Sequence, residues 1–189
     1  MSSSPKGKTN SQQTAAQARA EFEAHSAATS AARRERMDAA FGEGIPGRWV
    51  TSASWLSTAL FALVTAAAVI DPDRFIAAFF VVSVGFSFAG SALFAADIVL
   101  AASRSRDDLM GIGGLFFLAG SAPRAVQVSL LGSLVAQLVI AFSGAAARPF
   151  TPLAFATLVP ILGLSLCGFW AVRYGLFPAQ QVQPARRKP

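Results

Sequence analysis

Four long apolar segments constrain the fold of this chain more than any other feature of its sequence. They cover residues 49–70, 75–102, 125–147 and 151–174. Each is long enough to supply the roughly 20 apolar residues with which a helix crosses the hydrocarbon core of a bilayer. Only 14% of the 189 residues are charged, against about 25% in soluble domains. The sequence therefore predicts an all-α membrane protein with a four-transmembrane-helix bundle at residues 49–175.

Short links join these segments in pairs. Residues 71–74 (DPDR) separate the first two segments, and residues 148–150 (RPF) separate the last two. Links of so few residues require the helices on either side to run antiparallel. We therefore expect two antiparallel hairpins joined by a longer middle loop.

The basic residues are divided unequally between the two ends of such a bundle. All but two of the 16 Lys and Arg residues lie in the N-terminal segment, the middle loop or the C-terminal end. The exceptions are Arg74 and Arg148. Cytoplasmic loops carry an excess of Lys and Arg, so both termini are predicted to be cytoplasmic. The Ala- and Arg-rich composition is typical of a GC-rich bacterium, and we expect a multi-pass protein of the bacterial plasma membrane.

Polar segments flank the predicted bundle. Residues 1–48 contain few large apolar side chains and predict a cytoplasmic tail that is partly disordered. Met37 and Phe41 are one turn apart and predict a short amphipathic helix beside the membrane. Residues 176–189 predict a disordered, basic C-terminal tail. Four arginines near the first apolar segment are expected to bind anionic lipid headgroups; they are Arg33, Arg34, Arg36 and Arg48.

The middle loop contains a further apolar segment, residues 109–120 (LMGIGGLFFLAG). It is too short to span a bilayer. Its glycines follow no strand and precede no GK[ST] sequence, so they do not indicate a phosphate-binding loop. We expect an interfacial helix or turn, lying on the inner leaflet or packed under the bundle, and a re-entrant element is the alternative.

Asp97 is a carboxylate inside the second apolar segment. At 1.5 Å per residue it lies about 33 Å along a helix that enters the membrane near Phe75, which places it near the inner boundary rather than at the midplane. Counting back from Asp97 by threes and fours identifies one stripe of the helix: Phe94, Gly90, Ser87 and Ser83. Small and hydroxylated residues at this spacing allow helices to approach closely. We therefore interpret this stripe as part of an inward-facing polar seam.

A charged group in apolar surroundings is usually paired. Arg124, Gln127 and Arg173 fall at about the depth of Asp97 on the third and fourth segments, so we expect one of them to contact its carboxylate. Gln137 lies on the same stripe as Gln127. The alternative is that Asp97 accepts a proton or cation on a transport path that Gln127 and Gln137 also line.

Two patterns concern the contacts between helices. Pro160 lies inside the fourth segment and predicts a kink, which either lines a binding site or is filled by a neighbouring side chain. Ser129 and Ser133 form a small-xxx-small pair in the third segment. Such a pair is typical of a dimer face and equally of packing within one monomer.

Catalytic and metal-binding motifs are not found in the sequence, which lacks GxSxG and HExxH and has its one histidine, His25, in the polar tail. We expect no enzymatic activity, no cofactor, no metal and no nucleic-acid partner. The leading hypothesis is an accessory, scaffold or assembly subunit that acts through helix–helix contacts, as a homo-oligomer or with another membrane protein. The alternative is a small transporter or channel that uses the polar seam around Asp97.

Overall fold

The computed structural model describes residues 6–42, 44–105 and 111–177. Over these residues the chain is helical and contains no strand. Four helical segments are long and apolar enough to span a membrane. They are Arg48–Ile70, Pro72–Arg104, Arg124–Ala147 and Pro152–Tyr174. The prediction of an all-α protein with four candidate spans is confirmed.

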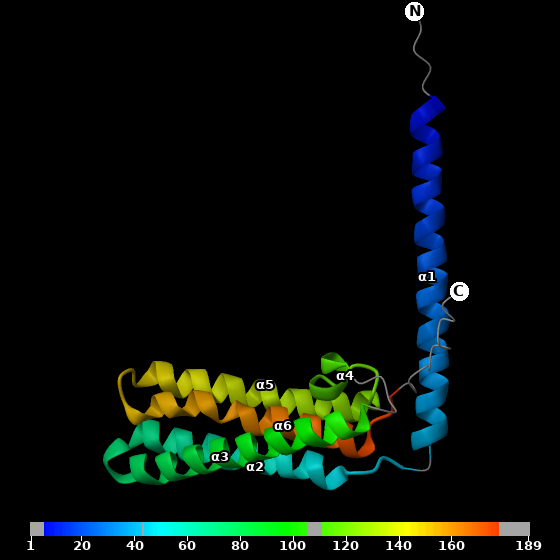
Figure 1. The fold of residues 1–189 in the computed structure, drawn as a ribbon. Coiled ribbons are helices and arrows are strands. Elements are labelled where there is room, and N and C mark those ends of the chain that lie inside the picture. Colours follow the sequence, from blue (N-terminus) through cyan, green and yellow to red (C-terminus); the bar gives the residue numbers. More distant parts are fainter. Residues whose placement is uncertain (1–5, 43, 106–110, 178–189) are drawn as a thin grey trace, which may run out of the picture. The chain divides into compact units, whose positions relative to one another are not determined.

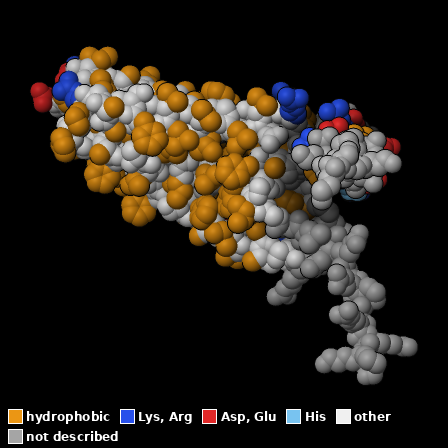
Figure 2. All heavy atoms as spheres, turned by 90° about the horizontal axis from the view of Figure 1, so that it is seen from above, with side chains coloured by type: hydrophobic (Ala, Val, Ile, Leu, Met, Phe, Trp, Pro, Cys, Tyr) orange, Lys and Arg blue, Asp and Glu red, His pale blue; other side chains and the backbone are white. Residues whose placement is uncertain are grey.

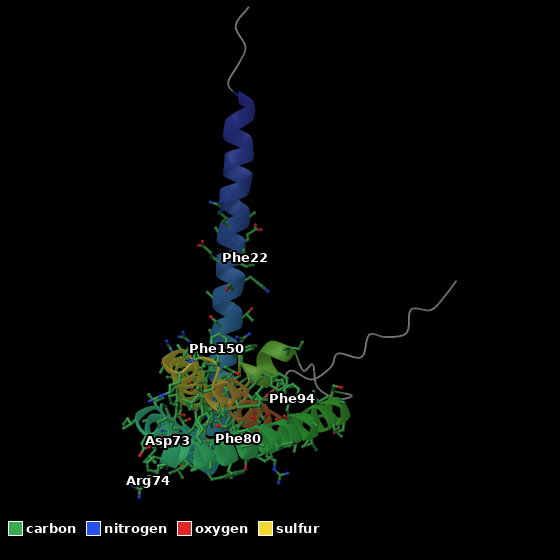
Figure 3. The ribbon with its side chains drawn as sticks, turned by 90° about the vertical axis from the view of Figure 1, so that its left-hand side faces the viewer. Phe22, Asp73, Arg74, Phe80, Phe94 and Phe150 are labelled. Atoms are coloured by element: carbon green, nitrogen blue, oxygen red, sulfur yellow. The ribbon has the colours of Figure 1, made fainter. Side chains whose placement is uncertain are left out.

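The chain divides into two compact units, residues 1–44 and residues 45–189. The first unit contains α1 (Lys6–Phe41), a single helix of 36 residues. The side chain of Phe22 is 73% exposed on it (Figure 3). Arg33, Arg34 and Arg36 are exposed as well. The helix is much longer than the short amphipathic helix that Met37 and Phe41 led us to expect.

The second unit begins with α2 (Arg48–Ile70) and α3 (Pro72–Arg104), which Asp71 alone separates. The Asp71 side chain accepts a hydrogen bond from the backbone N–H of Arg74 at 3.3 Å and so caps α3. Pro72 has no N–H to continue α2, and its fixed φ suits the first position of a new helix. α3 therefore begins three residues before the boundary predicted at Phe75.

Four helices of this unit lie side by side (Figure 1): α2, α3, α5 (Arg124–Ala147) and α6 (Pro160–Tyr174). The most extensive contacts join α3 to α6 and α2 to α5, while smaller ones join α2 to α3 and α5 to α6. The segment that contains α6 is the most buried of the four candidate spans, and α3 is the least buried. Much of the surface of α3 is therefore left uncovered.

Many apolar side chains lie on the face of the bundle that Figure 2 shows. Leu56 on α2, Phe88 on α3 and Phe142 on α5 are 71%, 74% and 62% exposed. Soluble proteins rarely expose apolar surface on this scale, whereas a helix bundle in lipid requires it. Asp73 and Arg74 lie at the start of α3 (Figure 3). The four apolar helices and this surface are consistent with a multi-pass integral membrane protein.

The fourth apolar segment consists of two elements. A 3₁₀ helix, η1 (Pro152–Leu158), is followed by α6, which begins at Pro160. In a continuous α-helix the N–H of residue 160 would donate to the carbonyl of Ala156, but proline has no N–H. The N–H of Val159 donates to that carbonyl instead, at 3.1 Å. Pro160 thus marks a change of helix type.

The links at residue 71 and at residues 148–151 lie at the same end of the bundle (Figure 1). Arg148 connects them, because its Nε and one terminal nitrogen donate to the carbonyl of Val69 at 3.1 and 2.9 Å. This bond satisfies an acceptor at the C-terminal end of α2. A buried apolar cluster lies among α2, α3, α5 and η1; its largest members are Phe61, Phe79, Leu153 and Val159.

The described part of the middle loop contains α4 (Ile112–Phe116), a helix of five residues that packs against α6. Leu115, Phe116 and Leu118 are buried there. Leu118 has φ 56°, and the N–H of Ala119 returns to the carbonyl of Gly113 at 2.9 Å. Residues 109–110 of the predicted segment lie outside the described residues.

The C-terminal segment expected to be disordered begins at residue 176, and residues 178–189 lie outside the described part of the chain. Leu176 and Phe177, the two described residues of this segment, contact the bundle. The N–H of Leu176 donates to the carbonyl of Ser121 at 2.9 Å, and the Arg104 guanidinium lies 5.8 Å from the centroid of the Phe177 ring. The bundle therefore holds the chain at least as far as Phe177.

Candidate functional site

Side-chain hydrogen bonds connect α2 to α5. The hydroxyls of Ser54 and Ser133 bond to each other in the buried interior. Trp55 Nε1 donates to Ser129 Oγ at 3.0 Å. Ser129 and Ser133 are thus engaged within the monomer, which is one of the two roles that their spacing allowed.

Gln137 extends this connection. Its side chain is fully buried, and its Nε2 donates to Thr58 Oγ1 at 2.9 Å. Its Oε1 has no hydrogen-bond partner among the described residues. That oxygen faces α6, since a Cβ added at Gly163 would lie 2.6 Å from it. Gln137 therefore lies between α2 and α6, away from the polar stripe of α3.

The contact between α3 and α6 depends on a close approach of the two backbones. A Cβ added at Gly90 would lie 2.6 Å from the backbone nitrogen of Leu162. Ser165 Oγ lies 2.8 Å from the carbonyl oxygen of Gly90 and 2.7 Å from that of Ile161, and donates to this pair of acceptors. Only glycine at position 90 permits this distance between the helices.

The predicted stripe of α3 faces this contact. Ser83, Gly90 and Asp97 are buried, and Ser87 is half-buried. The hydroxyls of Ser83 and Ser87 are shielded from solvent and have no hydrogen-bond partner among the described residues. The spacing of these residues correctly indicated the buried face of the helix, but not that its hydroxyls would lack partners.

Asp97 is the most unusual residue of this stripe. Its side chain is fully buried, and neither carboxyl oxygen has a hydrogen-bond partner among the described residues. A Cβ added at Gly168 of α6 would lie 2.8 Å from Oδ2 of Asp97 and 3.0 Å from the Phe116 ring of α4. Phe116 stacks on Phe94 with ring centroids 5.1 Å apart, and Figure 3 shows Phe94 beside α4. The carboxyl is thus enclosed by α6 and the aromatic side chain of α4.

The prediction that Asp97 pairs with Arg124, Gln127 or Arg173 is wrong. Arg124 and Arg173 are exposed, and Gln127 Nε2 donates to the carbonyl of Phe117 at 3.1 Å. The sequence predicts these partners only from their depth along the helix axes. The rotation of α6 about its own axis places Gly168 against the carboxyl and leaves Arg173 on the outer surface.

Arg104 has a role that the sequence analysis missed. It is half-buried near the C-terminal end of α3, and its guanidinium donates to the carbonyl of Val172 and, at 3.3 Å, to that of Gly175. The last carbonyls of a helix have no partner within the helix, and basic side chains often satisfy them. The guanidinium therefore holds the end of α6, one turn beyond Gly168. Its position two residues after the predicted helix end at residue 102 was the signal available in the sequence.

A cavity of about 350 Å³ lies where α2 and α5 begin. Arg48 and Thr51 line it from α2, and Ala125 and Ser129 from α5. Neither helix has a side-chain cap at this end. Arg48, which the sequence analysis assigned to lipid headgroups, therefore borders a concave site.

The outward face of α3 carries small side chains. Gly85, Ala89, Ala92 and Ala96 are all exposed, and their spacing of four, three and four residues places them on one stripe. A Cβ added at Gly85 would have no atom within 4 Å, so no part of the described chain covers the stripe there. A ridge of larger exposed side chains runs beside it; its members are Val81, Phe88 and Val99.

No family model, curated protein or solved structure matches this chain. The described residues contain no group of three or more His, Cys, Asp or Glu side chains placed to hold a metal ion. Three features of the structure bear on function: the enclosed carboxyl of Asp97, the cavity at Arg48 and the small-residue face of α3.

Proposed function

We propose that this protein is a non-enzymatic membrane protein that acts as an assembly subunit, and that it associates with a second copy of itself through the outer face of α3. The observation that carries this proposal is the exposed stripe formed by Gly85, Ala89, Ala92 and Ala96. In lipid, helices associate by close packing at small residues, because apolar side chains gain little from leaving lipid for a protein surface.

The shape of the α3 face favours a second copy as the partner. The small-residue stripe carries no side chain larger than a methyl group, and the exposed ridge of Val81, Phe88 and Val99 runs directly beside it. A two-fold axis would place the ridge of one copy against the small-residue stripe of the other, as an isologous interface requires. The comparable serines of α5 are already engaged with α2.

The test is the native mass of the tagged protein in mild detergent, for the wild type and for Ala89→Leu/Ala92→Leu. The wild type is expected at a multiple of the 19.7 kDa chain mass, and the variant is expected as a monomer because the leucine side chains prevent the close approach of a second helix. Ala59→Leu/Ala66→Leu is the matched control, since both alanines are exposed on α2. A monomeric wild type, or an equal response of the two variants, contradicts the proposal.

The same experiment separates self-association from other kinds of assembly. A stoichiometric partner of different sequence in the mass spectrum, lost in Ala89→Leu/Ala92→Leu, would assign the face to a heteromeric complex instead of a second copy.

The proposed topology is two antiparallel hairpins in the bacterial plasma membrane with both termini in the cytoplasm. The distribution of Lys and Arg supports it, because only Arg74 and Arg148 lie at the end that contains the short links. Cysteine replacements at Asp73 and Ser105 test the orientation in a Cys167→Ala background. An impermeant maleimide applied to intact cells is expected to label position 73 alone, and labelling of position 105 alone would reverse the topology.

Anionic lipid headgroups are the proposed ligands of the basic residues at the cytoplasmic end. The cavity beside Arg48 supports this role, because a guanidinium binds phosphate with several hydrogen bonds. Arg33, Arg34 and Arg36 are proposed to add electrostatic attraction to the membrane surface. Arg48→Gln is expected to retain less anionic phospholipid in native mass spectra than the wild type does. Arg74→Gln, at the opposite end, is the control.

A further inference from the structure

We infer that Asp97 is a proton-exchanging site enclosed by α4, and that its carboxyl reaches water only when α4 moves away from α6. This inference is independent of the assembly proposed above. It begins from a carboxyl that is fully buried and has no hydrogen-bond partner for either oxygen among the described residues. Such a group adds no bond to the fold, and ionisable residues in membrane helices commonly mark ion or proton pathways.

The surroundings of the carboxyl favour a proton over a larger ligand. Oδ2 lies against the backbone at Gly168, and the Phe116 ring closes the same space. A metal cation needs several oxygen ligands, and the described residues contain no group of three or more His, Cys, Asp or Glu side chains that could supply them. A proton requires no additional space. Protonation transfers H⁺ from a hydronium ion to one carboxyl oxygen and leaves water, and release reverses the transfer.

No described cation compensates the charge of the ionised form. Arg104, two turns further along α3, directs its guanidinium to the carbonyls at the end of α6. On α6, Arg173 is exposed, Tyr174 is half-buried and packs against Trp170, and the Cys167 side chain is buried. Residues 111–117, which form α4 and its two caps, contain no titratable side chain. The ionised carboxylate would therefore be an uncompensated charge in apolar surroundings, unless α4 admits water.

α4 is suited to act as a movable cover. It has only five residues, and it is held by the burial of Leu115 and Phe116 and by three side-chain hydrogen bonds or ring contacts among the described residues. Phe116 stacks on Phe94, Gln127 bonds to the carbonyl of Phe117, and Ser121 Oγ donates to the carbonyl of Gly114 at 2.6 Å. Short elements with few contacts open at a lower free energy than the long helices that they cover.

Labelling with dicyclohexylcarbodiimide tests both parts of the inference on the full-length protein in membranes. This apolar reagent takes the proton of a neutral carboxyl, the carboxyl oxygen adds to its central carbon, and rearrangement leaves a stable acylurea with the mass of one reagent molecule. Peptide mass spectrometry is expected to find this adduct at Asp97 in the wild type. The rate of adduct formation is expected to fall as the pH of the buffer rises, because the reagent needs the neutral carboxyl. Only a carboxyl that exchanges its proton with the buffer responds to that pH.

The cover is tested with two matched aromatic variants. Phe116→Ala is expected to raise the labelling rate of Asp97 several-fold. Phe80→Ala should leave the rate unchanged. Phe80 is on α3, the helix that carries Asp97, but its ring packs edge-to-face on Phe155, with ring centroids 5.3 Å apart. If Phe116→Ala does not accumulate, Gln127→Leu removes a bond that holds α4 and should also raise the rate.

Three results would overturn the inference. Absence of the adduct at Asp97 from the wild type and from the variant that loosens α4, Phe116→Ala or Gln127→Leu, would show that the carboxyl does not exchange. A labelling rate independent of pH would show the same. Equal rates in Phe116→Ala and Phe80→Ala would show that α4 is not the cover.

Discussion

The two largest helix contacts of the bundle differ in how their buried polar side chains are hydrogen-bonded. Between α2 and α5, side chains bond to side chains: Ser54 to Ser133, and Gln137 to Thr58. Between α3 and α6, the described side-chain hydrogen bonds go to backbone carbonyls instead: Ser165 to Gly90, and Arg104 to Val172. The side-chain oxygens of Ser83, Ser87 and Asp97 have no partner among the described residues.

The difference shows two ways of holding apolar helices together. Hydrogen bonds between side chains fix the register of α2 against α5 and contribute about 0.6 kcal/mol each. The α3–α6 contact depends on the absence of side chains at Gly90 and Gly168, which brings the two backbones close enough for van der Waals packing. The first contact pairs hydroxyl and amide side chains with one another, although Gln137 Oε1 has no described partner, whereas the second leaves both oxygens of a carboxyl without one.

The largest expected effect is a steric one at the α3–α6 contact. Gly90→Ala should lower the free energy of unfolding by about 1–3 kcal/mol, because the added methyl meets the backbone of Leu162. Gly85→Ala is the matched control on the same helix; it has open space and should gain up to about 1 kcal/mol of helix propensity. Unfolding titrations in mixed detergent measure both. Equal effects would mean that the close approach of α3 and α6 does not hold the bundle together.

The next effect compares two fully buried serines. Ser133→Ala removes the bond to Ser54 and should lower the free energy of unfolding by about 1 kcal/mol. Ser83→Ala removes a hydroxyl without a described partner and should leave stability unchanged or raise it. The same unfolding titration distinguishes the two. A larger loss at Ser83 than at Ser133 would reverse the comparison between the two contacts.

A smaller effect is expected from the coupling of Thr58 to Gln137. The single changes Thr58→Val and Gln137→Leu, together with the double change, form a double-mutant cycle. Their interaction energy should be about 0.6 kcal/mol, the average for hydrogen bonds between membrane helices. A coupling near zero would remove this pair from the bonds that join α2 to α5.

The smallest effect on stability is expected at the most polar residue. Asp97→Asn should not lower the free energy of unfolding, because no described donor loses an acceptor when the charge is removed. A buried ion pair broken in this way would instead cost about 3–5 kcal/mol. Thermal unfolding of the two proteins in the same detergent decides between these outcomes, and a large loss would restore the ion-pair interpretation.

Much of the fold could be predicted from the sequence, because the length of an apolar segment determines whether a helix can span the hydrocarbon core. The boundaries shifted where prolines act locally, as at Pro72 and Pro160. At the candidate site, the spacing of Ser83, Gly90 and Asp97 indicated the buried stripe. The partners of Asp97 could not be predicted, because depth along an axis does not determine how the neighbouring helix is rotated.

The sequence by itself determined the all-helical class, the four candidate spans and the face of α3 that turns inward. Only the tertiary structure decided that Gln137 bonds to Thr58, that Gly168 lies against Asp97 and that Phe116 covers it. The physical reason is that a helix that is apolar on all sides has no single face assigned to burial. Its rotation depends on how glycines, hydroxyls and amides from different helices fit together, and those contacts join residues far apart in the chain.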